Sequence, residues 1–531
     1  MKMDPKLFDV IHEGSASILF PKTQVFYNPV QQYNRDLSTL AIRAFANTKP
    51  VKRSHQSNPI PRLRILEALS ATGLRAIRYA NEIPQVETVV ANDLIQPAVD
   101  AIKRNISNNP LSKDKIQPNL DNAITHMAKN RRSYDVVDLD PYGSVAPFID
   151  SAMNAIKSGG LLLVTCTDLG VLAGNGYPEK CFSLYGGTNV WGDASHESAL
   201  RLVLGLIGRT AAKYGMAIEP VLSLSIDFYV RVFVRVYEKP AQVKQFMSSN
   251  EVVVKCSGCF ASMGQPLGRM GIPEGEKSRN KFGLAKIEED VGAKCSHCGF
   301  VNHICGPMWG GNLHNEEFIN EILKLVSQEE KKDSYNAIGK EIPNSMSYYG
   351  TLKRIRGMLT MAQNELGVND ESQIEQRQSQ LYFSPTSISS VLKIPAPSIH
   401  DYCNALGNLG YKASLTHAAP NCIKTNAPWK IRWFIGIQLS KRANIDVEKM
   451  NKNAAGYKIM TNEKIINAVD LKSIFGDGDE KELIGKLFGK CPVGEKVDRL
   501  RKIKIVKFQE NPTKNWGPKA RPQSKVNEET K

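Results

Sequence analysis

Between residues 60 and 170 the chain alternates short apolar segments with amphipathic ones, and this alternation constrains its fold more than any other feature. Four apolar segments are rich in Val, Ile and Leu, and they cover residues 63–68, 86–92, 134–140 and 160–167; the more polar residues 115–122 predict a short strand between the second and the third of them. The last segment lacks polar alternation, which is typical of a strand buried on both faces in a parallel sheet. We therefore expect an α/β fold, a doubly wound Rossmann-like domain whose strands end at one ligand-binding edge.

The fourth expected strand ends in Asp140-Pro141-Tyr142. Proline has no N–H group to continue a hydrogen-bond ladder, so the strand stops and its last side chains project into the crevice. The carboxylate of Asp140 and the carbonyls beside Pro141 can accept N–H bonds from an exocyclic amino group, while Tyr142 stacks on a planar substrate. The alternative interpretation is an ordinary strand-to-helix turn, in which these residue types are common.

A nucleoside-binding pattern precedes this motif. The first strand is followed by Ser70-Ala71-Thr72-Gly73, a turn of small residues that lets a ligand approach the backbone. Asp93 follows the second strand, twenty residues after Gly73, which is the spacing of an acid that binds ribose hydroxyls. Asp121 and Asn122 end the third strand, where they could bind an adenine edge. A structural coincidence is the alternative to a nucleoside cofactor.

The flanking segments extend this domain on both sides. Residues 8–30 predict a hairpin of two short strands. Residues 34–46 predict a helix, and we interpret Arg35 near its start as a surface charge, with a carboxylate-binding role as the alternative. The alternation in residues 218–225 and 228–236 is consistent with two strands on an antiparallel edge of the same sheet.

Two CxxC pairs then change the character of the chain: Cys256 with Cys259, and Cys295 with Cys298. Ten cysteines in 531 residues do not make a disulfide scaffold, so we expect reduced thiols in an intracellular protein. Four thiolates in two such pairs predict a tetrahedral Zn²⁺ site of structural type, because a closed set of four ligands leaves no open position. Residues 260–294 must then form an insertion or a hairpin, and unligated thiols are the alternative.

Helices dominate the C-terminal half. Before them, Gly306-Pro-Met-Trp-Gly-Gly311 predicts a tight aromatic turn, and residues 365–380 between helices predict a polar linker. Residues 381–416 predict a small winged-helix-like unit. A mixture of basic and aromatic residues follows, as on nucleic-acid surfaces; its members are Lys424, Trp429, Lys430, Arg432 and Trp433. The alternative is an ordinary solvated face with two core tryptophans.

The charge balance predicts a polyanionic partner, nucleic acid first and an acidic membrane surface second. The formal net charge is +16, and residues 499–525 carry nine Lys or Arg and one acid. Such a tail is typical of a basic arm on phosphates or of a nuclear-import signal. No apolar run reaches the length of a membrane span. The expected domains are 1–245 (α/β), 246–498 (α+β, with zinc) and 499–531 (disordered tail), with no sign of an obligate protein partner.

Many of these motifs occur in an order that resembles one family, the tRNA guanine-26 N2-dimethyltransferases of archaea and eukaryotes. The resemblance covers nearly the whole chain. Its elements are Phe26-Tyr-Asn-Pro29, Asn34-Arg-Asp36, Ala68-Leu-Ser-Ala-Thr-Gly-Leu-Arg75, Asn92-Asp93, Asp138-Leu-Asp-Pro-Tyr-Gly143, Cys181-Phe-Ser183, Tyr185-Gly186, the CxxC pairs, Gly306-Pro-Met-Trp309, Thr416-His417 and Lys424-Thr-Asn-Ala-Pro428. The basic end, from Asn511 to Arg521, resembles the eukaryotic branch.

The resemblance implies a class I methyltransferase that uses S-adenosylmethionine, contacts tRNA through its zinc-containing C-terminal domain, and forms N2-methyl- and N2,N2-dimethylguanosine. It assigns cofactor contacts to Arg35, Arg75, Asp93, Asp121 and Asn122. It also places Phe26 in the guanine pocket and makes Asp140-Pro141-Tyr142 the amine-methylating motif. Two positions depart from the family pattern: Asn122 intervenes before Ala123, and Tyr142 replaces a frequent Phe.

As a mechanism, hydrogen bonds from guanine N2–H to Asp140 and to a carbonyl beside Pro141 would orient the poorly nucleophilic nitrogen towards the sulfonium methyl. Asp140 then accepts the proton or passes it to water, and the base leaves the RNA stack to enter the pocket. Two other function classes stay open: an RNA-binding chaperone with a vestigial catalytic domain, and an amino-methyltransferase acting on DNA or a protein amide. The basic tail predicts a nuclear location, with a mitochondrial pool as an alternative.

Overall fold

The computed structural model describes residues 8–21, 27–48, 62–271, 281–337, 348–367 and 381–503. Its centre is a seven-stranded sheet in the order β5-β4-β3-β6-β7-β9-β8. The strands are β3 (Leu63–Glu67), β4 (Val86–Asp93), β5 (Ile116–Leu120), β6 (Tyr134–Leu139), β7 (Ile156–Cys166), β8 (Met216–Ile226) and β9 (Tyr229–Glu238). Strands β3 to β7 pair in parallel, and β9 pairs antiparallel with both β7 and β8. The α/β class and the antiparallel edge are therefore confirmed.

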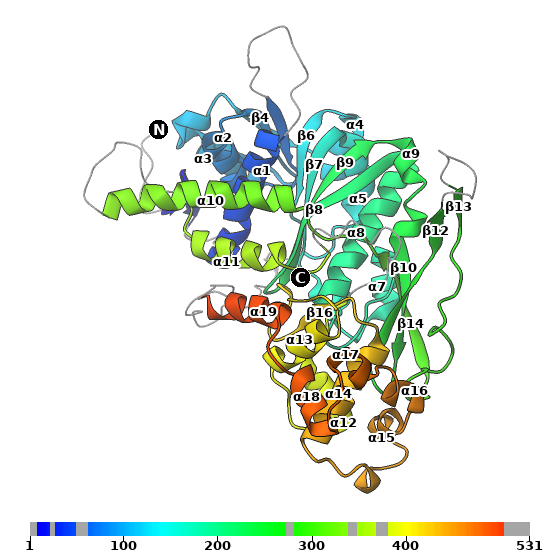
Figure 1. Cartoon of the computed structure of the whole chain (residues 1–531). Helices are drawn as coiled ribbons and strands as arrows, with labels where there is room; N and C mark the ends of the chain where they lie inside the picture. The colour runs from blue at the N-terminus through cyan, green and yellow to red at the C-terminus, as the bar shows by residue number, and fades with distance from the viewer. Residues whose placement is uncertain are drawn as a thin grey trace, which may run out of the picture.

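Helices cover both faces of the sheet (Figure 1). Alternate residues of β7 explain why: Leu161 and Leu163 belong to the core on one face, and Leu162 and Val164 belong to the core on the other. The first core includes α1 (Gln32–Thr48), α2 (Leu74–Glu82) and α3 (Gln96–Ser107), and the second includes α4 (Ala123–Lys129), α5 (Ile149–Ala155) and α8 (Ser195–Lys213). The strand is thus buried on both faces, as its sequence predicted.

The N-terminal hairpin and two later helices complete the first core. Strands β1 (Phe8–Glu13) and β2 (Ala16–Pro21) pair antiparallel, as expected, and the amide of Leu19 donates to Asn105 Oδ1 of α3 at 2.9 Å. Helices α10 (Glu316–Ala337) and α11 (Leu352–Gln363) contribute Phe318, Ile319 and Ile355 to this core. The long helix α10 crosses in front of the α1–α3 layer in Figure 1. Residues far apart in the sequence therefore enclose helix α1.

A small three-stranded sheet carries the cysteines. Its strands β10 (Asn250–Cys256), β11 (Ser262–Pro266) and β14 (Asn302–Trp309) lie in the order β11-β10-β14. Strands β12 (Gly268–Gly271) and β13 (Lys281–Leu284) form a hairpin between the two CxxC pairs, which confirms the expected insertion. The tight turn predicted over Gly306–Gly311 is wrong for residues 306–309, because they form the end of β14, which pairs with β10.

The remaining elements are mostly helical and form the lower part of Figure 1. They are α12 (Pro385–Leu392), α13 (Ile399–Asn408), β15 (Ala413–Leu415), β16 (Ile423–Thr425), α14 (Trp429–Arg442), α15 (Ala455–Met460), α16 (Glu463–Ile466), α17 (Leu471–Phe475), α18 (Glu480–Leu487) and α19 (Pro492–Lys502). Three short helices lie earlier in the chain: α6 (Leu169–Leu172), α7 (Pro178–Tyr185) and α9 (Pro240–Val243). Two helices and a short antiparallel pair of strands make up the winged-helix-like region.

The expected basic and aromatic surface is wrong for four of its five residues. Trp429, Trp433, Lys424 and Arg432 are buried, and Lys430 is exposed. Helix α14 is enclosed on nearly every side, so its aromatic rings and its arginine are buried. The two core tryptophans of the alternative are therefore confirmed, whereas its solvated face is wrong for Lys424 and Arg432. The disordered tail was expected from residue 499, but residues 499–502 form the last turn of α19, and residues 504–531 lie outside the described residues.

Candidate active site and cysteine cluster

The Asp140–Ser144 loop, which follows β6, is fixed against the end of β7. The amide of Gly143 donates to Thr167 Oγ1 at 2.8 Å, and the amide of Thr167 donates to the carbonyl of Gly143 at 3.0 Å. Pro141 is buried, whereas Tyr142 is 54% exposed and Asp140 is partly exposed. The proline therefore anchors the loop, and the carboxylate and the ring face the solvent side of the sheet edge, as the sequence predicted.

Arg75 of α2 forms an ion pair with Asp140, joining Nη2 to Oδ2. Its Nη1 lies 3.7 Å from Asp138 Oδ2 in the same strand, and the guanidinium is buried. Burial alone would lower the pKa of Arg75, but the carboxylates of Asp140 and Asp138 raise it above its usual range. A permanently charged guanidinium thus holds one oxygen of Asp140 and leaves Oδ1 for a ligand.

Asp138 is a buried carboxylate that the sequence analysis did not single out. Tyr79 Oη donates to its Oδ2 at 2.7 Å, and Arg231 Nη1 lies 2.9 Å from its Oδ1. Burial would raise the pKa of Asp138, but Arg231 and Arg75 hold it below its usual range. A charged residue inside an apolar, two-face-buried strand was the available signal, since such a charge requires partners.

The small-residue turn after β3 is held by two carboxylates. Asp93 Oδ2 accepts the amide of Ala71 at 2.9 Å, and Glu67 accepts the amide of Ala76 at 3.1 Å and the hydroxyl of Ser70. Burial raises the pKa of Glu67 to about 8. Gly73 has a φ of +77°, a conformation that glycine adopts without strain, and it begins α2. Asp93 therefore lies beside the backbone that a nucleoside would approach.

The end of β5 lies next to the end of β4. The amide of Asp121 donates to the carbonyl of Asp93 at 3.2 Å, and the Asp121 carboxylate is 3.6 Å from Lys129. Asn122 Oδ1 accepts the amides of Ile124 at 2.9 Å and Thr125 at 3.4 Å, so it caps α4. The structure brings Asp93 and Asp121 together at one edge. Within the part of the chain that the structure describes, no hydrogen bond from the amide nitrogen of Asn122 is present.

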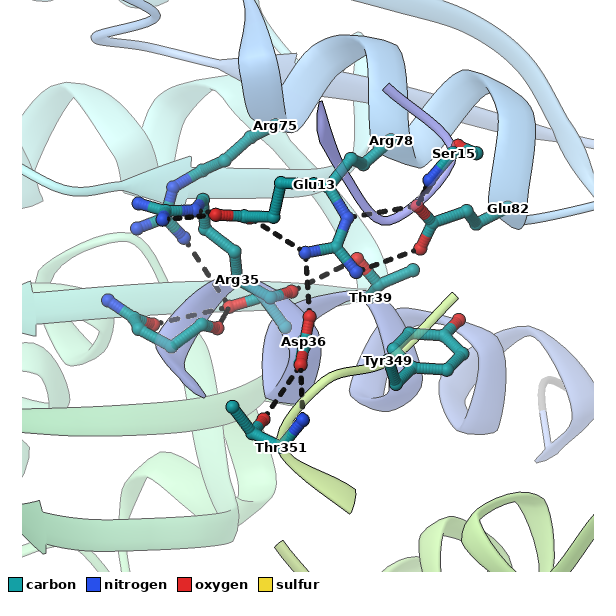
Figure 2. A network of polar contacts seen from close by, with 12 residues as sticks. Glu13, Ser15, Arg35, Asp36, Thr39, Arg75, Arg78, Glu82, Tyr349 and Thr351 are labelled. Carbon is teal, nitrogen blue, oxygen red and sulfur yellow. Dashed lines mark hydrogen bonds and ion pairs between the residues drawn. The ribbon is translucent and has the colours of Figure 1, made fainter. Parts of the chain in front are cut away.

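Arg35 is buried and paired, which makes its interpretation as a surface charge wrong. Its Nε donates to Glu13 Oε1 at 2.6 Å and its Nη2 to Glu13 Oε2 at 2.5 Å. The same Glu13 binds Arg78, which also pairs with Asp36 and Glu82 (Figure 2). Hairpin and helices thus share one buried ionic network. Phe26 lies outside the described residues.

The four cysteines of the CxxC pairs form one buried cluster. Cys256 Sγ lies 3.4 Å from Cys298 Sγ, Cys259 Sγ lies 3.7 Å from Cys295 Sγ, and all four atoms lie within 4.8 Å of one another. A tetrahedral site with Zn–S bonds of about 2.3 Å has edges of about 3.8 Å. The donor set and its dimensions therefore fit Zn²⁺.

A second buried group consists of His314, Glu365 and His417, whose ligand atoms also lie within 4.8 Å. Both imidazoles donate to Glu365, at 3.2 Å from His314 Nε2 and 3.1 Å from His417 Nδ1. The amides of Ser223 and Ser225 donate to the other ring nitrogens, at 3.3 and 3.2 Å. A neutral imidazole that accepts a backbone N–H carries its proton on the opposite nitrogen, so neither ring offers a lone pair to a metal.

The polar linker expected over residues 365–380 is wrong at its first residue, Glu365. Residues 365–367 are described and Glu365 is buried, with Lys424 Nζ at 3.9 Å from its Oε2, whereas residues 368–380 lie outside the described residues. Lys424 Nζ also lies 3.1 Å from Glu197 Oε1 of α8. Through these contacts, residues of the C-terminal half bind β8 and α8. No local pattern in the sequence predicted this network.

Comparisons with known proteins give a consistent result. Residues 8–435 match the family model described as N2,N2-dimethylguanosine tRNA methyltransferase. The chain is 44% identical to the mitochondrial tRNA (guanine(26)-N(2))-dimethyltransferase of Saccharomyces cerevisiae, over 97% of this chain and 92% of that protein. It is 34% identical to the human tRNA (guanine(26)-N(2))-dimethyltransferase, over 98% of this chain and 79% of that protein.

A solved structure agrees with the sequence relatives. The complex of Trm1 from Pyrococcus horikoshii with S-adenosyl-L-methionine aligns with a TM-score of 0.60 and 27% identity, over 80% of this chain and 98% of that one. The similarity therefore extends over four-fifths of this chain.

Proposed function

The chain belongs to the N2,N2-dimethylguanosine tRNA methyltransferase family, and from that premise we propose how its residues transfer methyl groups to N2 of guanine 26 in tRNA. The enzyme takes the methyl groups from S-adenosylmethionine and forms N2-methyl- and N2,N2-dimethylguanosine. The observation that carries the residue assignment is the position of Asp140-Pro141-Tyr142, at the carboxyl end of β6 and beside Arg75. Ligands of such sheets bind outside these strand ends.

The cofactor site is proposed along the ends of β3, β4 and β5. Asp93 accepts the ribose hydroxyls, and the small residues from Ser70 to Gly73 allow close approach of the nucleoside. Asp121 and the amide nitrogen of Asn122 bind the adenine edge. Arg35 and Arg75 supply positive charge for the carboxylate end. Bound S-adenosylmethionine supplies an electrophilic methyl group on a sulfonium.

Guanine is held by the Asp140–Ser144 loop. Asp140 Oδ1 accepts one N2–H while Arg75 keeps Oδ2 in place, so the carboxylate is oriented before the substrate arrives. The carbonyls beside Pro141 accept the second N–H, and the exposed ring of Tyr142 stacks on the base. Phe26 remains a predicted part of the same pocket. The leaving proton passes to Asp140 or to water.

The four thiolates of Cys256, Cys259, Cys295 and Cys298 are proposed to hold one structural Zn²⁺. Its closed shell fixes β10 and β14 to each other and takes no part in methyl transfer.

The tRNA contacts are proposed on the C-terminal domain and on the tail, since residues 499–525 carry nine Lys or Arg and one acid. A nuclear location, with a mitochondrial pool, is proposed from the basic tail and from the yeast relative's name. A fluorescent fusion of the whole chain, compared with one lacking residues 504–531, tests this. Among the described helices, none has the length and apolarity that a membrane crossing needs.

The direct test is methyl transfer from labelled S-adenosylmethionine to unmodified tRNA, with nucleoside analysis of the product. We expect N2,N2-dimethylguanosine, and no label when guanine 26 is replaced by adenine. Transfer to duplex DNA but not to tRNA would overturn the tRNA assignment. Binding of tRNA without any cofactor binding would favour an RNA chaperone.

A further inference from the structure

Glu13, the last residue of β1, joins three side chains from other elements (Figure 2). Its Oε1 accepts Arg35 Nε at 2.6 Å and Arg78 Nη1 at 2.9 Å. Its Oε2 accepts Arg35 Nη2 at 2.5 Å and the hydroxyl of Tyr27 at 2.9 Å. The carboxylate is only 2% exposed, so the geometry of this group is fixed by protein atoms.

The pairing leaves one specific donor of Arg35 available. Glu13 occupies the Nε and Nη2 edge of the guanidinium, and Nη2 also donates to the carbonyl of Asn28 at 3.2 Å. Within the described residues, no hydrogen bond to Nη1 of Arg35 is present, and this atom is not sealed from solvent. A guanidinium held along one edge offers the other N–H groups to an incoming carboxylate in a fixed direction.

Arg35 depends on Glu13 for its carboxylate partner, whereas Arg78 has two other carboxylate partners. Without Glu13, Arg78 would keep Asp36 at 2.7 Å and Glu82 at 2.9 Å. Arg35 would keep only the carbonyl of Asn28 and the ring of Tyr27, whose centroid is 5.3 Å from its Cζ. Although burial would raise the pKa of Glu13, Arg35 and Arg78 hold it below its usual range, so Glu13 is charged at neutral pH.

We propose that Glu13 is a positioning residue of the methyl-donor site, which orients Arg35 so that Nη1 receives the cofactor carboxylate. This inference rests on the proposed function, because it takes Arg35 as the carboxylate-binding residue. Glu13 touches neither cofactor nor substrate and acts through Arg35. The N-terminal hairpin is therefore part of the cofactor site, and its role is to direct one guanidinium.

The experiment compares Glu13→Gln with Glu82→Gln in the full chain. Both substitutions replace a buried carboxylate that binds Arg78, and only the first removes the partner of Arg35. Calorimetry measures the Kd of two probes, S-adenosylmethionine and 5′-methylthioadenosine, which keeps the adenosine and lacks the carboxylate. Thermal unfolding and steady-state kinetics with tRNA accompany each measurement.

For Glu13→Gln we expect the Kd and KM of S-adenosylmethionine to rise about tenfold, the effect of losing one well-placed charged contact. The Kd of 5′-methylthioadenosine, the KM of tRNA and the kcat at saturating cofactor should change less than about threefold. Glu82→Gln should lower the unfolding temperature and leave both Kd values unchanged. Glu13→Asp keeps the negative charge but moves it away from Arg35, because its side chain is shorter. This variant should also raise the Kd of S-adenosylmethionine, and it replaces Glu13→Gln in the experiment if Glu13→Gln does not fold.

Three results would overturn the inference: an unchanged Kd for S-adenosylmethionine in both Glu13 variants, an equal loss for both probes, or an equal loss in Glu82→Gln. Failure of the proposed function has a different signature. If the wild-type chain binds S-adenosylmethionine but does not methylate tRNA, the tRNA assignment is wrong. The ratio of the variant Kd to the wild-type Kd, measured for each of the two probes, would still test the role of Glu13.

Discussion

Arg75 and Asp140 form an ion pair across the carboxyl edge of the sheet, although they lie 65 residues apart in the sequence. Arg75 follows the turn that would receive the cofactor nucleoside, and Asp140 begins the loop that would receive guanine. One guanidinium therefore lies between the two proposed binding sites. This ion pair holds Asp140 in one orientation without a bound substrate. Variants of the residues around it can therefore show separately how methyl transfer and cofactor binding depend on each residue.

Replacing Asp140 by Ala should lower kcat by about two to three orders of magnitude, because the acceptor that orients N2–H is lost. The Kd of S-adenosylmethionine should stay within about threefold of wild type. Single-turnover methylation and calorimetry measure the two quantities. Asp150→Asn is a control, since Asp150 is an exposed carboxylate that pairs with Lys213. An equal loss of turnover and cofactor binding would remove Asp140 from its assigned role.

Tyr142 should act through its ring. Tyr142→Phe should keep most of the activity, because stacking needs the ring and not the hydroxyl. Tyr142→Ala should raise the KM of tRNA or lower kcat by about tenfold, since loss of one stacked base costs about 1–3 kcal/mol. The side chain is 54% exposed, so both variants should unfold at nearly the wild-type temperature. Full activity in Tyr142→Ala would show that the ring does not contact the base.

Asp138→Asn should lower the free energy of unfolding by about 3–5 kcal/mol, because it leaves the buried charges of Arg231 and Arg75 without their shared carboxylate. Urea titration followed by circular dichroism gives this value. Asp135→Asn is the matched control in the same strand, since its partner Lys157 is 39% exposed and the loss there should be about 1 kcal/mol. Equal losses in the two variants would contradict the account of Asp138 as the centre of the network.

One Zn²⁺ per chain should be found by elemental analysis of purified protein. Removal with a strong chelator, or Cys298→Ser, should lower the unfolding temperature by several degrees, because the ion links two CxxC pairs across the small sheet. The Kd of S-adenosylmethionine should remain close to wild type in both cases. Cys305→Ser is the control, since Cys305 is a buried thiol outside the cluster. A metal-free protein of unchanged stability would reject the site.

Acid should destabilise the network around Glu365. Burial lowers the pKa of His314 below its usual 6.5, so the folded chain keeps the ring neutral while the unfolded chain takes up a proton. Burial would raise the pKa of Glu365, but His417 and Lys424 hold it well below its usual 4.5. The unfolded state thus binds more protons than the folded state at both His314 and Glu365. Stability therefore falls as the pH drops below 6.5, where unfolded His314 is protonated, and falls further below 4.5, where unfolded Glu365 is protonated.

Glu365→Gln isolates part of this effect. The variant should be less stable than wild type by about 1–3 kcal/mol at pH 7.5, since it removes the buried charge that accepts hydrogen bonds from His314 and His417, whereas Lys424 keeps Glu197 at 3.1 Å. The difference between the two proteins should shrink as the pH falls through the acid range, because the wild-type carboxylate is then protonated. Urea titrations at several pH values measure it. A difference independent of pH would contradict the assigned charges.

Local sequence patterns were sufficient to predict the α/β fold and the edge of the sheet at which the candidate site lies. Strand positions follow from local apolar runs, and the breaks after β3 and β6 follow from Gly73 and Pro141, whose backbone chemistry is local. Once the strands are parallel, their carboxyl ends meet at one edge, so Asp93, Asp121 and Asp140 could be placed together. Two CxxC pairs likewise predict a cluster, because the spacing within each pair is fixed by a short turn.

Local patterns did not predict which charged side chains are buried or which partners they bind, because the partners come from distant segments. Arg35 resembled a surface charge, Glu365 resembled part of a linker, and Lys424 resembled part of a nucleic-acid surface, yet each is buried in an ionic network. Their partners lie 22, 52 and 227 residues away in the sequence. A local pattern reports the polarity of a residue and its neighbours, whereas burial of a charge depends on a partner that folding brings from a distant segment.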